Sequence, residues 1–194
     1  MDRDLNIWVN INPYNNKKEA KPHSDAILQQ LLQGELKTSV PVSVLKTKQG
    51  KPYIKEPGCF SHSNSRKLHA YVFAAQHEVG LDIEKIEPKR NVLKLSERYF
   101  HNEEYQYLKA LSGVDRTLAF YQLWTHKEAW CKLEGGQMWS YMNRSVLSPS
   151  SLKTQDGTPI HMIKNQQIKG FACSVATTKP YRLIRINHLA WPEQ

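Results

Sequence analysis

The sequence FYQLWTHKEAWCKLEGG, residues 120–136, decides the fold of this chain because it predicts one long, mostly buried helix. We expect this helix to begin near Asp115, as its N-cap, and to end at the pair Gly135 and Gly136. Apolar side chains occur on all sides of its helical wheel, which is typical of a buried helix. These side chains are Leu118, Tyr121, Leu123, Trp124, Ala129, Trp130 and Leu133.

Two charged residues interrupt this apolar helix. Glu128 and Lys132 are four positions apart, so they share one face, which Tyr121 and Trp124 flank. A carboxylate in such surroundings needs a partner, because an unpaired buried charge is costly. An ordinary Glu–Lys pair within the helix satisfies this need, and the helix alone does not distinguish that pair from a functional site.

The composition is that of a globular protein with an excess of positive charge. The chain has 194 residues, 40% hydrophobic and 23% charged, which suffices for one domain or two small halves. The net charge of +9 favours an acidic partner: nucleic acid, anionic lipid, a phosphorylated ligand or an acidic protein. Lys and Arg are spread along the chain, so charge alone does not select among these partners.

The sequence predicts neither a membrane span nor a secretion signal. It has no apolar run of membrane-spanning length, and its first residues lack a basic segment followed by an apolar one. The cysteines, Cys59, Cys131 and Cys173, are odd in number and have no CxxC spacing. This pattern favours a reducing cytoplasm over a disulfide framework or a zinc site.

The first half of the chain is expected to be rich in strands. We predict strands over 5–11, 39–47, 68–75 and 79–84, the last two antiparallel to each other. A short helix is expected from Ser24 to Gly34, after a polar loop over 12–22. Residues 60–67, FSHSNSRK, are expected to form another polar loop.

Helices precede strands in the second half. After a linker over 87–91 we predict a helix over 92–100, a helix capped by Asn102, and the long helix. Strand candidates follow at 159–163, 168–176 and 181–187. This order of elements predicts an α+β fold.

Two carboxylates in the strand GLDIE form the second charged cluster. Asp82 and Glu84 are two positions apart, so their side chains share one face, whereas Leu81 and Ile83 face the other way. Carboxylates held side by side remain ionised when a cation lies between them. A solvated strand end, with Lys85 as counter-charge, is the simpler alternative for this pair alone.

Together, Asp82, Glu84 and Glu128 make a set of oxygen ligands suited to Mg²⁺. The histidines show no HxH or HxxxH spacing, which argues against zinc. His62, between Ser61 and Ser63, and Lys51, on a Gly-Lys-Pro turn, are groups that can contact phosphate. A polar turn and a solvated lysine explain the same residues without a ligand.

These motifs resemble a known family. GLDIEKIEP (80–88), RYFHNEEY (98–105) and residues 120–136 are similar to the signature blocks of the 4'-phosphopantetheinyl transferases of the surfactin-synthetase and holo-acyl-carrier-protein type. GKP (50–52) and SHS (61–63) match that family in order and spacing, and the resemblance covers roughly 48–190.

The resemblance implies a site and a reaction. Asp82, Glu84 and Glu128 would bind Mg²⁺ on the coenzyme A pyrophosphate, which Lys132 would neutralise. Lys51, Ser61 and His62 would bind the 3'-phospho-ADP part, and Glu128 and Lys132 would be catalytic. A carrier-protein serine would attack the β-phosphorus of coenzyme A, taking phosphopantetheine and releasing adenosine 3',5'-bisphosphate.

The family also implies two pseudo-symmetric α+β halves, here 1–77 and 78–194, with the site in the cleft between them. Expected partners are coenzyme A and an acidic acyl or peptidyl carrier protein, rather than nucleic acid or membrane, and the protein is expected to be a cytoplasmic monomer. From the residues alone, a metal-dependent nuclease and a non-catalytic basic nucleic-acid-binding protein remain the alternatives.

Overall fold

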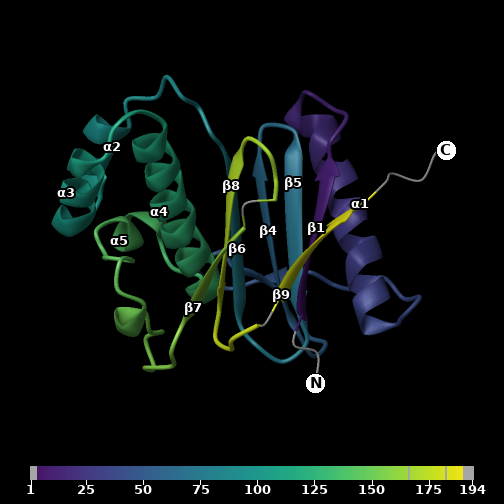
Figure 1. Cartoon of the computed structure of the whole chain (residues 1–194). Coiled ribbons are helices and arrows are strands. Elements are labelled where there is room, and N and C mark those ends of the chain that lie inside the picture. The colour runs from purple at the N-terminus through teal and green to yellow at the C-terminus, as the bar shows by residue number, and fades with distance from the viewer. Residues whose placement is uncertain (1–3, 166, 182, 190–194) are drawn as a thin grey trace.

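The computed structural model describes residues 4–165, 167–181 and 183–189, which fold into two larger β-sheets with helices on both sides and one two-stranded sheet (Figure 1). In chain order the elements are β1 (Asp4–Ile11), α1 (Lys17–Leu36), β2 (Leu45–Lys46), β3 (Pro52–Tyr53), β4 (Cys59–Ser65), β5 (Leu68–Ala74), β6 (Val79–Lys85), α2 (Val92–Tyr99), α3 (Asn102–Ala110), α4 (Gly113–Glu134), α5 (Met138–Met142), the 3-10 turn η1 (Pro149–Ser151), β7 (His161–Asn165), β8 (Phe171–Thr177) and β9 (Leu183–His188). The predicted α+β class is confirmed.

The two larger sheets divide the strands between the ends and the middle of the chain. The first has the order β4-β5-β1-β9, in which β1 is antiparallel to β5 and parallel to β9. The second has the order β6-β8-β7, all antiparallel. In Figure 1, α1 lies outside the first sheet, and α4, with α2 and α3 beyond it, lies outside the second.

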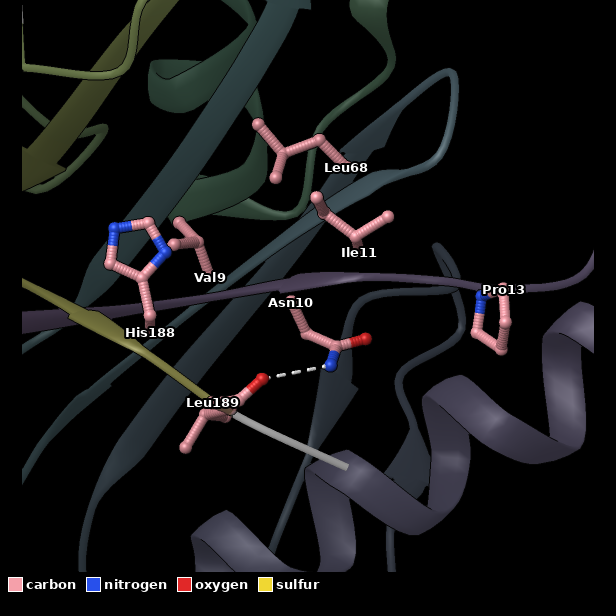
Figure 2. A pocket seen from close by; sticks show the side chains of 7 residues that line it. All are labelled: Val9, Asn10, Ile11, Pro13, Leu68, His188 and Leu189. Carbon is pink, nitrogen blue, oxygen red and sulfur yellow. Dashed lines mark hydrogen bonds between the residues drawn. The ribbon is translucent and has the colours of Figure 1, made fainter. Parts of the chain in front are cut away.

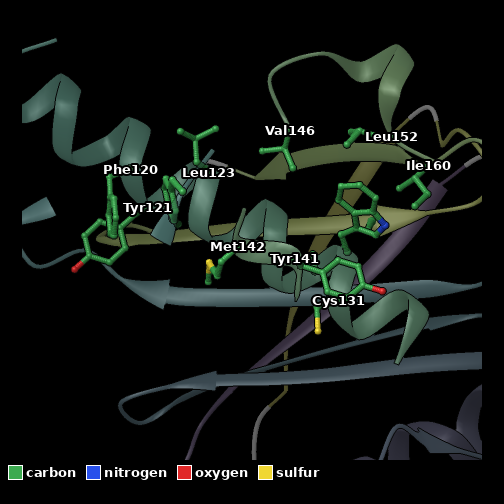
Figure 3. Close-up of a cluster of buried hydrophobic side chains, with 14 of the residues drawn as sticks. Phe120, Tyr121, Leu123, Cys131, Tyr141, Met142, Val146, Leu152 and Ile160 are labelled. Carbon is green, nitrogen blue, oxygen red and sulfur yellow. The ribbon is translucent and has the colours of Figure 1, made fainter. Parts of the chain in front are cut away.

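Three clusters of buried apolar side chains among the described residues follow this layering. One lies between α1 and the first sheet, and a second joins the facing strands of the two sheets. The third surrounds α4 and includes the labelled side chains of Figure 3: Phe120, Tyr121, Leu123, Cys131, Tyr141, Met142, Val146, Leu152 and Ile160. The layers are therefore held by apolar burial on both faces of each sheet.

The long helix α4 confirms the prediction from residues 120–136, with a small shift at its start. It begins at Gly113 after Ser112, so Asp115 lies in the first turn instead of at the N-cap. It ends at Gly135, whose φ of 71° is left-handed and whose N–H donates to the carbonyl of Cys131. Glycine adopts this conformation without the steric cost that other residues meet.

Two predictions about the strands next to the site are wrong. The strand β6 does not pair with β5: it pairs with β8 in the other sheet, so the chain changes sheets after Ala74. Residues 60–67 are not a loop, since β4 pairs with β5 from Cys59 to Ser65. The buried positions of β4 include Ser61, Ser63 and Ser65. Because these residues are polar, the strand shows no alternation of apolar and polar residues in the sequence.

The first helix is also longer than predicted. It begins at Lys17, where the side chain of Asn16 accepts the N–H of Glu19, and continues through Pro22 to Leu36. A proline in the second turn still removes one helical hydrogen bond, but buried side chains including Ile27 and Leu32 hold α1 against the first sheet.

The remaining elements lie close to their predicted positions. The expected helix over 92–100 is α2, and α3 is capped by His101, one residue before Asn102. Of the strand predicted over 39–47, only Leu45–Lys46 forms. The strands predicted over 159–163, 168–176 and 181–187 correspond to β7, β8 and β9, each with shifted ends. The pseudo-symmetry of the halves 1–77 and 78–194 stays a prediction.

Candidate active site

Three carboxylates from two elements meet where β6 crosses α4. Asp82 and Glu84 on β6 and Glu128 on α4 each offer an oxygen, and these oxygens lie within 4.8 Å of one another. The period of two along β6 brings the first two together, while Leu81 and Ile83 are buried on the opposite face, as predicted. The three carboxylates that the sequence analysis grouped together thus lie close together in the structure, and their role as metal ligands stays a prediction.

A glycine allows β6 and α4 to approach this closely. A Cβ on Gly80 would lie 2.0 Å from the carbonyl oxygen of Ala129 and 2.5 Å from the nitrogen of Leu133. Both contacts are with backbone, which cannot rotate away. Gly80 therefore sets the distance between the strand that carries Asp82 and the helix that carries Glu128.

Asp82 is buried, and its two carboxylate oxygens have different surroundings. Its Oδ1 accepts hydrogen bonds from Lys132 Nζ at 2.7 Å and from the hydroxyl of Ser63 at 2.8 Å. Its Oδ2 is buried and has no hydrogen-bond partner among the described residues. An orphaned carboxylate oxygen in a buried position calls for a further positive group.

Glu128 lies in surroundings that oppose its charge. Burial first, and then the neighbouring Asp82, raise the pKa of Glu128 to about 7, with Lys132 acting in the opposite direction. The indole N–H of Trp124, one turn earlier on α4, donates to Glu128 Oε1 at 2.9 Å and fixes that oxygen. Burial also raises the pKa of Glu84, and a hydrogen bond from Ser65 lowers it.

This donor set fits a divalent cation with a preference for oxygen. Within the described part of the chain, Lys132 is the ammonium in contact with this cluster, and one buried oxygen of Asp82 lacks a partner. Hard carboxylate oxygens are the protein ligands that suit Mg²⁺ and Mn²⁺. A cation held by Asp82, Glu84 and Glu128 would oppose the mutual repulsion that adds to burial in raising the pKa values of Glu84 and Glu128.

A pocket of about 230 Å³ adjoins the carboxylates and contains the residues predicted to contact phosphate. Lys51, Ser61, His62 and Lys132 all line it, together with Gln49, Gly50, Pro52, Phe60, Cys131, Gly135 and Gly136. Lys132 joins the two parts of the site, since it lines the pocket and also contacts Asp82.

Two of these pocket residues have structural partners as well. Lys51 Nζ contacts Glu78 Oε2 and the carbonyl of Leu133, each at 2.5 Å, so it neutralises the C-terminal end of α4. His62 stacks on Tyr71, with 4.6 Å between ring centroids, and its Nε2 lies 3.0 Å from Nδ1 of His69. Burial, followed by the charges of His69 and Lys132, lowers the pKa of His62 to about 3, so the ring is neutral at pH 7.

A separate hollow of about 410 Å³ lies on the first sheet beside the end of β1 (Figure 2). Its lining is mostly aliphatic: Val9, Asn10, Ile11, Pro13, Leu68, His188 and Leu189. The amide of Asn10 donates to the carbonyl of Leu189 at 3.0 Å and joins β1 to the residue after β9. The carboxylates lie elsewhere, on β6 and α4, so this hollow is not part of the candidate site.

Sequence reasoning missed Ser63 and Ser65 as functional candidates. Their hydroxyls contact Asp82 and Glu84, respectively. Ser61, Ser63 and Ser65 recur at every second position, the same spacing as the two carboxylates, and this shared period was the available signal.

None of the described helices is both long enough and apolar enough to span a bilayer.

Comparison with known proteins shows which family this chain resembles. The family model described as the 4'-phosphopantetheinyl transferase superfamily matches residues 78–180. A protein of Synechocystis named as a putative 4'-phosphopantetheinyl transferase is 33% identical over 111 residues, which cover 55% of this chain and 45% of that protein. The 4'-phosphopantetheinyl transferase AcpT of Salmonella typhimurium is 30% identical over 137 residues, or 70% of this chain and 67% of AcpT.

A third relative is the 4'-phosphopantetheinyl transferase gsp of Aneurinibacillus migulanus, 27% identical over 134 residues, which cover 66% of this chain and 55% of gsp. The matched part of this chain thus spans about half to two thirds of these relatives' lengths. This chain belongs to the 4'-phosphopantetheinyl transferase superfamily.

Proposed function

We propose that this protein transfers the 4'-phosphopantetheine group from coenzyme A to a serine of an apo acyl or peptidyl carrier protein and releases adenosine 3',5'-bisphosphate. This proposal rests mainly on the cluster of Asp82, Glu84 and Glu128. Lys132 contacts this cluster and also lines the neighbouring pocket. Membership of the transferase superfamily favours this reaction over a nuclease or a nucleic-acid-binding module.

The reaction needs a group that neutralises the pyrophosphate of coenzyme A. Mg²⁺, held by Asp82, Glu84 and Glu128, would supply Lewis-acid charge at the phosphate oxygens. Lys132 adds a second positive charge at the same place, since its Nζ lies 2.7 Å from Asp82 Oδ1 and its side chain is 30% exposed. Phosphoryl transfer depends mainly on such positioning and charge neutralisation.

The pocket is proposed to bind the nucleotide end of coenzyme A. Its charged lining residues, Lys51 and Lys132, favour phosphate, and the hydroxyl of Ser61 and the neutral ring of His62 can donate hydrogen bonds to phosphate oxygens. Lys51 must then exchange part of its present contact with Glu78 for the ligand.

The attacking serine loses its proton as its oxygen forms a bond to the β-phosphorus and the bond to the bisphosphate leaving group breaks. Glu128 is the proposed acceptor of that proton, because its carboxylate lies in the cluster that would hold the pyrophosphate through the cation. The net charge of +9 is suited to an acidic carrier protein, and we propose that the protein acts as a cytoplasmic monomer.

The test is intact-mass spectrometry of an apo acyl carrier protein, and separately of an apo peptidyl carrier protein, incubated with the enzyme, coenzyme A and Mg²⁺. We expect the carrier to gain the mass of one phosphopantetheine group, and we expect EDTA to prevent the gain. Asp82→Ala should abolish the gain and Lys132→Ala should slow it strongly. Failure to modify either carrier would contradict the proposed function.

A further inference from the structure

The strand β4 presents three buried hydroxyls to the edge of β6. Ser61, Ser63 and Ser65 accept the backbone N–H groups of Leu81 at 3.0 Å, Ile83 at 3.3 Å and Lys85 at 2.9 Å. The opposite edge of β6 pairs with β8, so these N–H groups point away from their own sheet. Serine hydroxyls thus take the place of a neighbouring strand and join the two sheets.

Two of the three hydroxyls also donate a hydrogen bond to a carboxylate. Ser63 donates to Asp82 Oδ1 and Ser65 donates to Glu84 Oε2, each at 2.8 Å. The hydroxyl of Ser61 has the same kind of backbone donor, Leu81, but its nearest equivalent position on β6 is Gly80, which has no side chain. All three serines therefore accept a backbone N–H of β6, but only Ser63 and Ser65 of the three also contact a carboxylate.

The bonds of Ser63 leave its hydroxyl no freedom to rotate. It accepts from the N–H of Ile83 and from Lys132 Nζ, the latter at 2.7 Å, and its only proton goes to Asp82. One proton and two lone pairs are all that a hydroxyl offers. As a result Asp82 Oδ1 receives two donors, and Oδ2 is the oxygen to which no described residue donates.

We infer that Ser63 and Ser65 are positioning residues for the divalent cation: they orient Asp82 and Glu84 so that each carboxylate presents one oxygen to it. This inference rests on the proposed function, since it assumes the cation site. Hydrogen bonds to metal-ligating carboxylates reduce the cost of ordering the ligands before the metal binds, and their loss lowers metal affinity about 10–100-fold.

The test measures binding of Mn²⁺ alone to the full chain, without coenzyme A or carrier protein, from the EPR signal of free Mn²⁺. Ser65→Ala and Ser63→Ala are each expected to weaken binding by about 10-fold or more. Ser61→Ala is the matched control, because it removes an equivalent N–H acceptor without removing a carboxylate contact. Ser65→Thr retains the hydroxyl and should retain the affinity.

Thermal unfolding of each variant separates a structural loss from the positioning effect. Each alanine variant should lose stability, since each leaves one backbone N–H of β6 without its acceptor, and Ser61→Ala measures this structural loss without a lost carboxylate contact. Should an alanine variant fail to fold, Ser65→Cys keeps the size of the side chain with a weaker hydrogen bond, and it should bind Mn²⁺ less tightly than Ser65→Thr.

Equal Mn²⁺ affinity in Ser61→Ala, Ser63→Ala and Ser65→Ala would overturn the inference. That result would leave the proposed function untouched, because transfer to the carrier protein is measured separately by mass. Absence of Mn²⁺ binding to the unmodified protein would overturn the inference as well, whereas the metal dependence of the transfer is judged separately by the effect of EDTA on the carrier mass.

Discussion

Lys127 and Glu104 form an ion pair in which neither side chain is exposed, with 2.6 Å between Lys127 Nζ and Glu104 Oε2. The pair joins α4 to α3, and it also orders the segment after α5: Lys127 donates to the carbonyl of Arg144, and Glu104 Oε1 accepts the N–H of Val146. Lys127 and Lys132 lie on the same helix, yet one stabilises the fold and the other faces the carboxylates.

Breaking this pair should destabilise the protein without altering the site directly. Lys127→Met leaves Glu104 buried and uncompensated, and we expect the free energy of unfolding to fall by about 3–5 kcal/mol. Urea denaturation measures this change. The double variant Lys127→Met/Glu104→Leu should recover much of the loss, because it removes both charges. A single variant as stable as the unmodified protein would refute the structural assignment.

Glu128→Gln should separate activity from stability. We expect loss of transfer, together with an unchanged or higher melting temperature at pH 8 in the absence of divalent cations. The reason is that burial and the charges of Asp82 and Glu84 disfavour the ionised Glu128, whose pKa is raised to about 7. The amide oxygen of glutamine can still accept the bond from Trp124. A clearly lower melting temperature would show that the carboxylate stabilises the fold.

Gly80→Ala should weaken both the fold and the cation site. The added Cβ would meet the backbone of Ala129 and Leu133 on α4, so the helix must move away from β6. We expect a loss of about 1–3 kcal/mol, the range for overpacking, and weaker Mn²⁺ binding. Gly34→Ala is the matched control: nothing lies within 4 Å of its added Cβ, and alanine in a helix is favoured by about 0.5–1 kcal/mol. Equal stability of the two variants would contradict this account.

Stability should fall in acid because His62 resists protonation in the folded state. Its pKa is lowered from 6.5 to about 3, chiefly by burial, so between these values the unfolded chain binds a proton that the folded chain does not. The free energy of unfolding therefore decreases as the pH falls below about 6.5. In His62→Gln this decrease should be smaller between pH 7 and pH 5, as measured by urea denaturation at each pH. His126, whose pKa is lowered to about 4, should supply part of the remaining slope. An identical slope in the variant would refute this role for His62.

The carboxylate cluster was predictable because short-range spacing determines most of it. The period of a strand places Asp82 and Glu84 on one face, and the period of a helix places Glu128 and Lys132 on another. The two faces meet because α4 is buried against β6. The residues of β4 next to the carboxylates were harder to predict from the sequence. The inward residues of this strand are serines, so its polar pattern resembles that of a loop.

The pairing of strands could not be derived from the local pattern. The short connection over residues 75–78 suggests a hairpin of β5 with β6, yet β6 joins β8, and β9 returns to β1. Such choices depend on contacts between distant parts of the chain. The ion pair of Lys127 and Glu104 was missed for the same reason, because neither residue is marked by its own neighbours in sequence.

The parallel pairing of β1 with β9 has a consequence for synthesis of the protein. Almost the whole chain separates Leu5 from its partner Ile184, so β1 leaves the ribosome long before β9 does. At about 5–20 residues per second, the interval amounts to roughly ten seconds or more. During that time β1 is an open edge of the sheet, a template for unwanted pairing with other nascent chains. Chaperone binding to the emerging chain should therefore matter most before residue 188 is made.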